Sequence, residues 1–139
     1  MASPLAGVWE MDGDDPILGP ADSLFLYTDT HYAVLRVAKD RKRFRGDQPT
    51  DAEAAEAFRA MAAAAGTYTL SGSKMTSNQE LSRTPGAAPQ THEITFDGPD
   101  RLRGTFTMRD GRKIDWAMRR IASPGGAPEP AAALAQEAT

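Results

Sequence analysis

The sequence places a few groups capable of acid–base chemistry in segments of alternating polarity. His92 alternates with Ile94 and Phe96, and an imidazole on such an apolar wall could titrate near neutrality and exchange protons with a ligand. A structural histidine bonded to a neighbouring strand fits the same pattern. Tyr27 could offer its hydroxyl to a developing oxyanion, or could simply pack with a wet tip. His31 lies beside a predicted turn, where we expect exposure to solvent.

A second candidate lies in residues 74–82, which are polar on both faces of a predicted strand. Ser77 and Gln79 lie between Met75 and Leu81 on one face. The segment is either a solvated, edge-like strand or the source of the few polar groups of a small-molecule pocket. In the second case Glu80 is the acid–base candidate, because desolvation would raise the pKa of an inward carboxyl group.

Two parts of the sequence contain arginines that could bind an anion. Arg36 shares a face with Tyr32 and Val34, and an inward guanidinium would need an anion or a buried partner. The basic segment of residues 39–45 could be a nucleic-acid patch around Phe44, a solvated loop, or a lid whose arginines meet a ligand carboxylate. The net charge of −3 favours the solvated loop, so we expect no nucleic-acid partner.

Other familiar sites are missing from the sequence. It has no cysteine and two histidines, which makes a zinc site unlikely to form and leads us to expect no metal. It also lacks a phosphate-binding glycine loop, a dinucleotide fingerprint and a Gly-x-Ser-x-Gly motif. Any enzymatic activity would therefore be independent of cofactors.

The elements that must position these residues are short strands. Turn residues separate eight segments rich in β-branched, aromatic or alternating residues: 7–11, 23–28, 31–37, 66–70, 74–82, 91–96, 101–108 and 113–121. The last three strands each direct bulky residues to one face, and these are His92, Ile94, Phe96, Leu102, Phe106, Met108, Ile114, Trp116 and Met118. A sheet that closes on itself satisfies this pattern and removes exposed edges.

One helix is predicted to interrupt the strands. Thr50 and Glu53 have the spacing of a capping box, and Gly66 follows as a C-cap. A narrow apolar stripe suited to docking on the barrel would consist of Ala54, Phe58, Met61, Ala62 and Ala65. The predicted fold is thus all-β, an eight-stranded antiparallel up-and-down barrel over residues 1–122 with one helix inserted mid-chain. Residues 123–139, rich in alanine and proline, are predicted to form a flexible tail.

Over roughly residues 7–121 the sequence resembles the bacterial lipocalin-like domains of the calycin superfamily. The resemblance rests on Gly7-x-Trp9, Gly66-Thr67-Tyr68, Ser82-Arg83-x-Pro85-Gly86 and Trp116-x-Met118-Arg119-Arg120. It implies that Trp9 plugs one end of the barrel and that Arg119 or Arg120 lies across its ring. The absence of a signal peptide and of cysteine, together with the mid-chain helix, favours the intracellular bacterial branch, so we expect a cytoplasmic protein.

Two functions are compatible with this fold. The first is binding of one small, largely apolar or amphipathic molecule by Tyr27, Arg36, Ile94, Phe96, Phe106, Met108, Trp116 and Met118. The second is a cofactor-independent isomerase, cyclase or lyase of secondary metabolism, with catalytic residues drawn from His92, Tyr27 and Glu80. A His or Glu within hydrogen-bond reach of a Tyr in the cavity would favour the enzyme. We expect no membrane partner, and a homodimer is compatible with either function.

Overall fold

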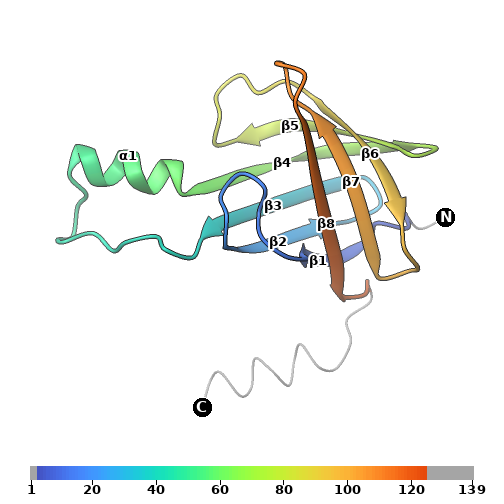
Figure 1. Cartoon of the computed structure of the whole chain (residues 1–139), viewed down its shortest axis with the longest axis horizontal. Coiled ribbons are helices and arrows are strands. Elements are labelled where there is room, and N and C mark those ends of the chain that lie inside the picture. Colours follow the sequence, from blue (N-terminus) through green and yellow to red (C-terminus); the bar gives the residue numbers. More distant parts are fainter. Residues whose placement is uncertain (1–2, 125–139) are drawn as a thin grey trace, which may run out of the picture.

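The computed structural model describes residues 3–124 and contains the predicted eight-stranded antiparallel barrel, closed in the order β1 to β8. Figure 1 shows β2 to β5 running across the view and β6 to β8 crossing them steeply. The strands are β1 (Gly7–Met11), β2 (Ala21–Tyr27), β3 (His31–Ala38), β4 (Met61–Ser71), β5 (Lys74–Ser82), β6 (Gln90–Phe96), β7 (Arg101–Thr107) and β8 (Lys113–Ala122). One helix, α1 (Asp51–Arg59), lies between β3 and β4.

Cross-strand register decides which side chains enter the barrel. Tyr27 on β2 pairs directly with Tyr32 on β3, and Phe25 pairs with Val34. Directly paired residues point to the same face of a sheet, so both sets face inward. Arg36, which shares a face with Tyr32 and Val34, therefore faces inward as well.

Helix α1 begins as predicted but ends much earlier. The hydroxyl of Thr50 accepts a hydrogen bond from the Glu53 amide, and the Glu53 carboxylate accepts one from the Thr50 amide, which completes the capping box. The C-cap is Ala60, not Gly66. Met61, Ala62 and Ala65 therefore belong to β4 and not to a helical stripe.

The alanines of residues 62–65 form a strand because β3 lies beside them. Ala62 pairs with Arg36 and Ala65 pairs with Ala33 across this interface. Alanine strongly favours helix in isolation, but tertiary pairing overrides a propensity of less than about 1 kcal/mol per residue. The chain thus leaves the helix directly into the longest strand of the barrel.

A bulge alters the inward face of β5. Gly66 pairs with Gln79 while the preceding Ala65 pairs with Leu81, so Glu80 is an extra residue on β5. A β-carbon on Gly66 would lie 1.9 Å from the backbone oxygen of Asn78, which explains the glycine at this crossing. Beyond the bulge, the inward and outward positions of β5 are exchanged relative to the simple alternation of its sequence. Leu81, predicted to share the face of Met75, is instead 72% exposed.

The end of the barrel near the N-terminus is filled. Trp9 and Leu5 are completely buried, and the indole Nε1 of Trp9 donates a hydrogen bond of 2.8 Å to the Leu5 carbonyl. The guanidinium of Arg120 lies 4.3 Å from the centre of the Trp9 ring. Of the two arginines that the resemblance offered, Arg120 is the one across the plug, while Arg119 pairs with Glu10 on the outside.

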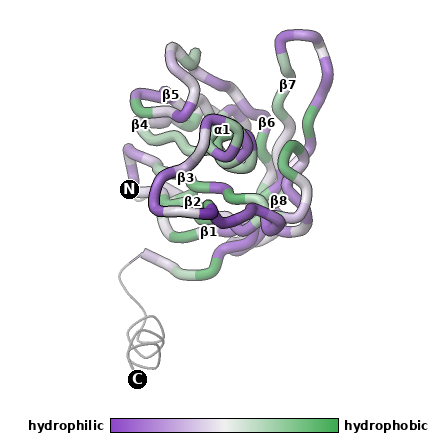
Figure 2. Tube along the Cα trace, turned by 90° about the vertical axis from the view of Figure 1, so that its left-hand side faces the viewer, coloured by the Kyte–Doolittle hydropathy of each residue, from purple (hydrophilic) through white to green (hydrophobic). Residues whose placement is uncertain are grey.

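Helix α1 and residues 39–50 project from the opposite end. Figure 2, with this end toward the viewer, shows α1 in front of the barrel. Residues 39–50 are exposed throughout, as expected of a solvated loop, and no residue of α1 is buried. Within residues 3–124 no helix has the length and apolar character needed to cross a membrane. The predicted tail begins at Ser123 and Pro124, and its remainder lies outside the described residues.

Candidate functional site

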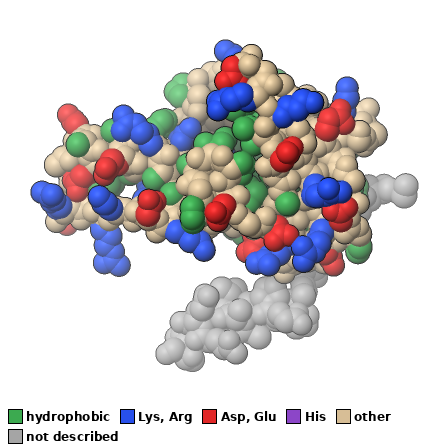
Figure 3. Space-filling model, in the orientation of Figure 1, with side chains coloured by type: hydrophobic (Ala, Val, Ile, Leu, Met, Phe, Trp, Pro, Cys, Tyr) green, Lys and Arg blue, Asp and Glu red, His purple; other side chains and the backbone are tan. Residues whose placement is uncertain are grey.

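The barrel encloses a cavity of about 280 Å³ between the buried plug and helix α1. Its volume is close to the lower limit of about 300 Å³ for ordinary ligand pockets. Figure 3 shows hydrophobic side chains gathered near the centre of the face seen in Figure 1, with charged side chains around them. The wall is mainly apolar, and its larger apolar members are Met11, Ile17, Phe25, Tyr27, Tyr32, Val34, Met75, Phe106, Ile114, Trp116 and Met118.

Six apolar residues of the last three strands are predicted to bind the ligand, and three of them line this cavity. Phe106, Trp116 and Met118 are among its lining residues. Ile94 and Phe96 also point into the barrel but pack in the core, where the Phe96 ring lies 6.5 Å from that of Trp9. Met108 follows the end of β7, and its sulfur contacts Arg112. Ile94, Phe96 and Met108 are therefore not part of the cavity wall.

Gly104 makes room for the indole ring of Trp116. The two residues pair across β7 and β8, and a β-carbon on Gly104 would lie 2.1 Å from Cζ2 of Trp116. The ring thus lies flat over a strand position that has no side chain. The sequence signal for this arrangement is a glycine inside a strand, which often marks the close approach of another group.

His92 is held by that same tryptophan. The Trp116 Nε1–H group donates a hydrogen bond of 3.0 Å to Nδ1 of His92. With Nδ1 accepting, the neutral ring carries its proton on Nε2, and His92 can only donate a hydrogen bond to a ligand through that atom. Burial, and secondarily the positive charge of Arg36, lower the pKa of His92 to about 4. Of the two alternatives for His92, the lowered pKa favours the structural one, because the imidazole stays neutral near pH 7.

Three tyrosines form an aromatic cluster, and two of them, Tyr27 and Tyr32, line the cavity. The Tyr27 ring lies 6.2 Å from that of Tyr32 and 5.3 Å from that of Tyr68. Burial, with smaller contributions from Tyr32 and Tyr68, raises the pKa of Tyr27 well above its usual value. Tyr27 is consequently a neutral phenol at physiological pH and cannot act as a base.

The hydroxyl of Tyr32 differs from that of Tyr68. Tyr68 donates a 2.5 Å hydrogen bond to the Thr28 carbonyl and lies 2.6 Å from the Ser3 hydroxyl. The buried Tyr32 hydroxyl has no hydrogen-bond partner among residues 3–124. Burial raises the pKa of Tyr32, and the side chain of the neighbouring Ser77 offsets part of that rise. Tyr32 lines the cavity, while its hydroxyl is buried in the wall and is not exposed to the cavity.

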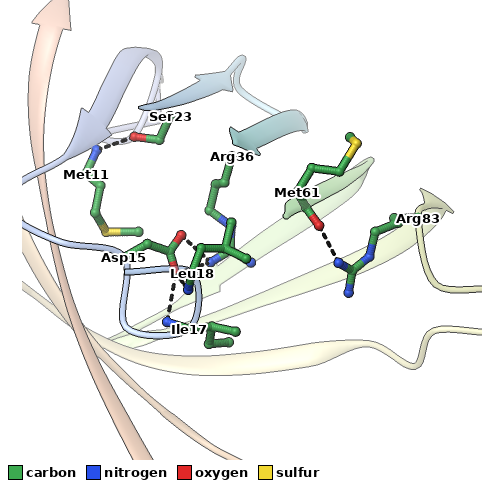
Figure 4. Close-up of polar contacts among 8 residues, drawn as sticks. All are labelled: Met11, Asp15, Ile17, Leu18, Ser23, Arg36, Met61 and Arg83. Carbon is green, nitrogen blue, oxygen red and sulfur yellow. Dashed lines mark hydrogen bonds and ion pairs between the residues drawn. The ribbon is translucent and has the colours of Figure 1, made fainter. Parts of the chain in front are cut away.

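Arg36 is inward and has the buried partner that its position requires. Its Nη1 lies 2.9 Å from Oδ2 of Asp15, whose side chain is 1% exposed. Figure 4 shows this pair beside the short loop before β2, where Oδ1 of Asp15 also accepts hydrogen bonds from the amides of Ile17 and Leu18. Sequence reasoning required a partner for Arg36 but did not identify Asp15, because 21 residues separate the two.

Arg83, just after β5, also lines the cavity. Its Nη1 donates hydrogen bonds to the carbonyls of Phe58 and Met61, the second of which is drawn in Figure 4. Its guanidinium carbon lies 4.7 Å from the centre of the Phe58 ring. The buried Nε of Arg83 has no partner among residues 3–124. In the sequence, Arg83 stands out only as part of the Ser82-Arg83-x-Pro85-Gly86 motif of the resemblance.

Glu80 is not part of the cavity. The bulge places its side chain on the outer surface, where it accepts a 3.3 Å hydrogen bond from the Thr67 hydroxyl. The desolvation argument for an inward Glu80 therefore does not apply. Ser77 and Gln79, on the same strand, do line the cavity and supply the polar groups expected of a pocket strand. Residues 3–124 contain no cluster of three or more His, Asp or Glu able to hold a metal ion.

The cavity thus combines an apolar wall with neutral or cationic hydrogen-bond donors. It can hold a small molecule and orient a polar group on it, but it does not place a base beside a phenol. His31 lies outside this set, exposed at the β2–β3 turn and bonded to Thr30. Comparison with protein-family models and with curated proteins finds no match to this chain.

Proposed function

We propose that the protein binds one small, amphipathic organic molecule inside its barrel. The observation that carries this proposal is the cavity of about 280 Å³, which the plug at Trp9 leaves unfilled. A concave, largely apolar pocket with a few polar groups in its wall is the usual form of a small-molecule site. A ligand that occupies it would remove apolar wall surface from water, which favours binding.

The chemistry of the wall supports an amphipathic ligand. Phe25, Phe106 and Trp116 offer aromatic surface to an apolar body. His92, Ser77 and Gln79 add polar groups at fixed positions, which is the usual combination in small-molecule sites. The resemblance to bacterial lipocalin-like domains, with its tryptophan plug and crossing arginine, also supports a binding role.

Binding fits the arrangement better than proton transfer. An enzyme of the alternative kind would need a His or Glu close to a Tyr in the cavity. His92 instead bonds Trp116, and Glu80 lies on the outer surface. With a pKa of about 4, His92 is also a weak base near neutrality.

A cavity-filling variant with a matched control tests this function. The two neighbouring residues of β4, Ala64 and Ala65, point to opposite faces, and Ala64 lines the cavity. Naphthalene and 2-naphthol are suitable probes, with thermal shift and intrinsic tryptophan fluorescence as readouts. A probe at about 100 times its Kd should stabilise the wild-type chain by about 2.7 kcal/mol. Ala64→Phe should abolish this effect, and Ala65→Phe should retain it.

The outcomes separate clearly. Binding by the wild type and by Ala65→Phe, but not by Ala64→Phe, supports occupancy of the barrel. If Ala64→Phe binds the probes as well as the wild type does, the ligand lies elsewhere. Failure of every small aromatic probe to raise the Tm of the folded chain would overturn the proposed function.

A further inference from the structure

The charged side chains around the cavity are distributed unevenly. The lining includes Arg36 and Arg83, whereas none of the lining residues is Asp or Glu. The whole chain has a net charge of −3, so the cavity lining is positively charged although the protein as a whole is negatively charged. Asp15 holds one nitrogen of Arg36 from the loop before β2 and lies outside the lining.

Unused hydrogen-bond donors coincide with the same surface. Within residues 3–124, the buried side-chain nitrogen and oxygen atoms that lack a partner are Nε of Arg83 and the hydroxyl of Tyr32. Both residues line the cavity. A buried donor without an acceptor costs free energy, and native proteins keep few of them. Neither atom is exposed to the cavity, but both belong to residues that a ligand in the cavity would contact.

The arginines and the tyrosine lie at different depths. Arg36 pairs with Ala62, just after α1, and Arg83 bonds the Phe58 and Met61 carbonyls, so both arginines lie at the α1 end. Tyr32 is four residues before Arg36 on β3, which corresponds to about 13 Å along a strand. A ligand with an anionic group at the α1 end and an apolar body extending toward Tyr32 matches this layout.

We propose that the ligand is a small amphipathic carboxylate whose anionic group lies at the α1 end between Arg36 and Arg83. Its apolar body lies against Phe25 and Trp116 and extends toward Tyr32. The inference rests on the proposed function, since it names the class of molecule that the cavity takes. A cation would meet two guanidinium groups, and a plain hydrocarbon would form no charge-assisted hydrogen bond with either of them.

Two isosteric probes test the charge requirement without altering the protein. 2-Naphthoate and 2-naphthamide share ring and shape but differ in charge at pH 7. Isothermal titration calorimetry should show that the wild-type chain binds the carboxylate at least about tenfold more tightly, because a charge-assisted hydrogen bond is stronger than a neutral one. Naphthalene serves as the uncharged reference for occupancy of the cavity.

Two variants locate the source of this preference. The double substitution Asp15→Asn with Arg36→Gln removes the buried pair together, so the net charge is unchanged and no buried ion is left alone. Arg83→Gln removes the second guanidinium. Each should lower the ratio of carboxylate to amide affinity by several-fold while naphthalene binding is retained. The ligand comparison in the wild type stands even if one variant does not fold.

Each outcome decides a different point. Equal affinity for 2-naphthoate and 2-naphthamide would overturn the anion assignment and leave the proposed function standing. A preference for the carboxylate that persists undiminished in both variants would overturn the assignment to Arg36 and Arg83. If the carboxylate, the amide and naphthalene all fail to bind the folded chain, the proposed function itself fails and this inference fails with it.

Discussion

Two regions of the barrel each combine arginine with aromatic rings, but they use the arginine differently. At the plug, Arg120 lies over Trp9 and donates hydrogen bonds to the carbonyls of Pro4, Ala6 and Pro99. In the cavity, Arg83 lies over Phe58 but retains a buried Nε without a partner among residues 3–124. Polar groups that are satisfied mark a structural end, whereas unsatisfied ones mark the end that can receive a ligand.

The largest expected effect breaks the plug. Trp9→Ala should lower the free energy of unfolding by about 3–5 kcal/mol, because the indole is completely buried and its removal leaves a large hole. Trp116→Ala, at the half-buried cavity wall, should cost clearly less. Urea denaturation followed by circular dichroism measures both values. Equal losses would contradict the distinction between a filled end and an open one.

The next effect concerns the ion pair at the cavity. Arg36→Ala alone leaves the Asp15 carboxylate buried without its cation, which we expect to destabilise the fold by about 2–4 kcal/mol. Adding Asp15→Asn should recover much of this loss, because the unpaired buried charge is removed. Chemical denaturation of the two single variants and the double variant gives the coupling energy. A strictly additive result would show that the pair does not act as a unit.

The pH dependence of stability tests whether the cavity keeps His92 neutral. The pKa of His92 is about 4 in the folded chain, below the ordinary value of 6.5, so the unfolded state binds its proton more readily. Stability from this group is complete above about pH 6.5 and is lost as the pH falls toward 4, by up to about 3 kcal/mol.

His92→Gln provides the matched control for this pH effect. Its side-chain oxygen can still accept from Trp116, but the side chain does not titrate. Denaturation curves between pH 4 and 7 should therefore fall less steeply for the variant than for the wild type. Parallel curves would show that His92 is not kept neutral by the fold.

The smallest effect compares two tyrosine hydroxyls. Tyr68→Phe should lower stability by about 1–2 kcal/mol, because it removes the donor to the Thr28 carbonyl. Tyr32→Phe should be neutral or slightly stabilising, since the lost hydroxyl has no partner among residues 3–124. Thermal denaturation of both variants measures the difference. A larger loss for Tyr32→Phe would show that the Tyr32 hydroxyl does form a stabilising hydrogen bond in the folded chain.

The structure also shows where local patterns stop being informative. The capping box of Thr50 and Glu53 predicted the start of α1 correctly, because both hydrogen bonds lie within four residues. The end of α1 could not be predicted, since the alanines after Met61 are placed by pairing with β3, which lies far back in the sequence. Likewise, the sequence could not show that Leu81 leaves the face of Met75, because this change occurs at a bulge that depends on the approach of Gly66 to Asn78.

The sequence by itself determined the number of strands and the inward side of β6 to β8, because alternation and turn residues act locally, while the plug at Trp9 was implied only by the resemblance to lipocalin-like domains. Tertiary structure alone decided which inward residues fill the core and which surround the cavity. It separated Phe96, at the plug, from Phe106, at the cavity, although both point into the barrel. It also joined Asp15 to Arg36 and Trp116 to His92. Such contacts depend on the closure of the barrel, which brings distant strands together in a register that no single segment encodes.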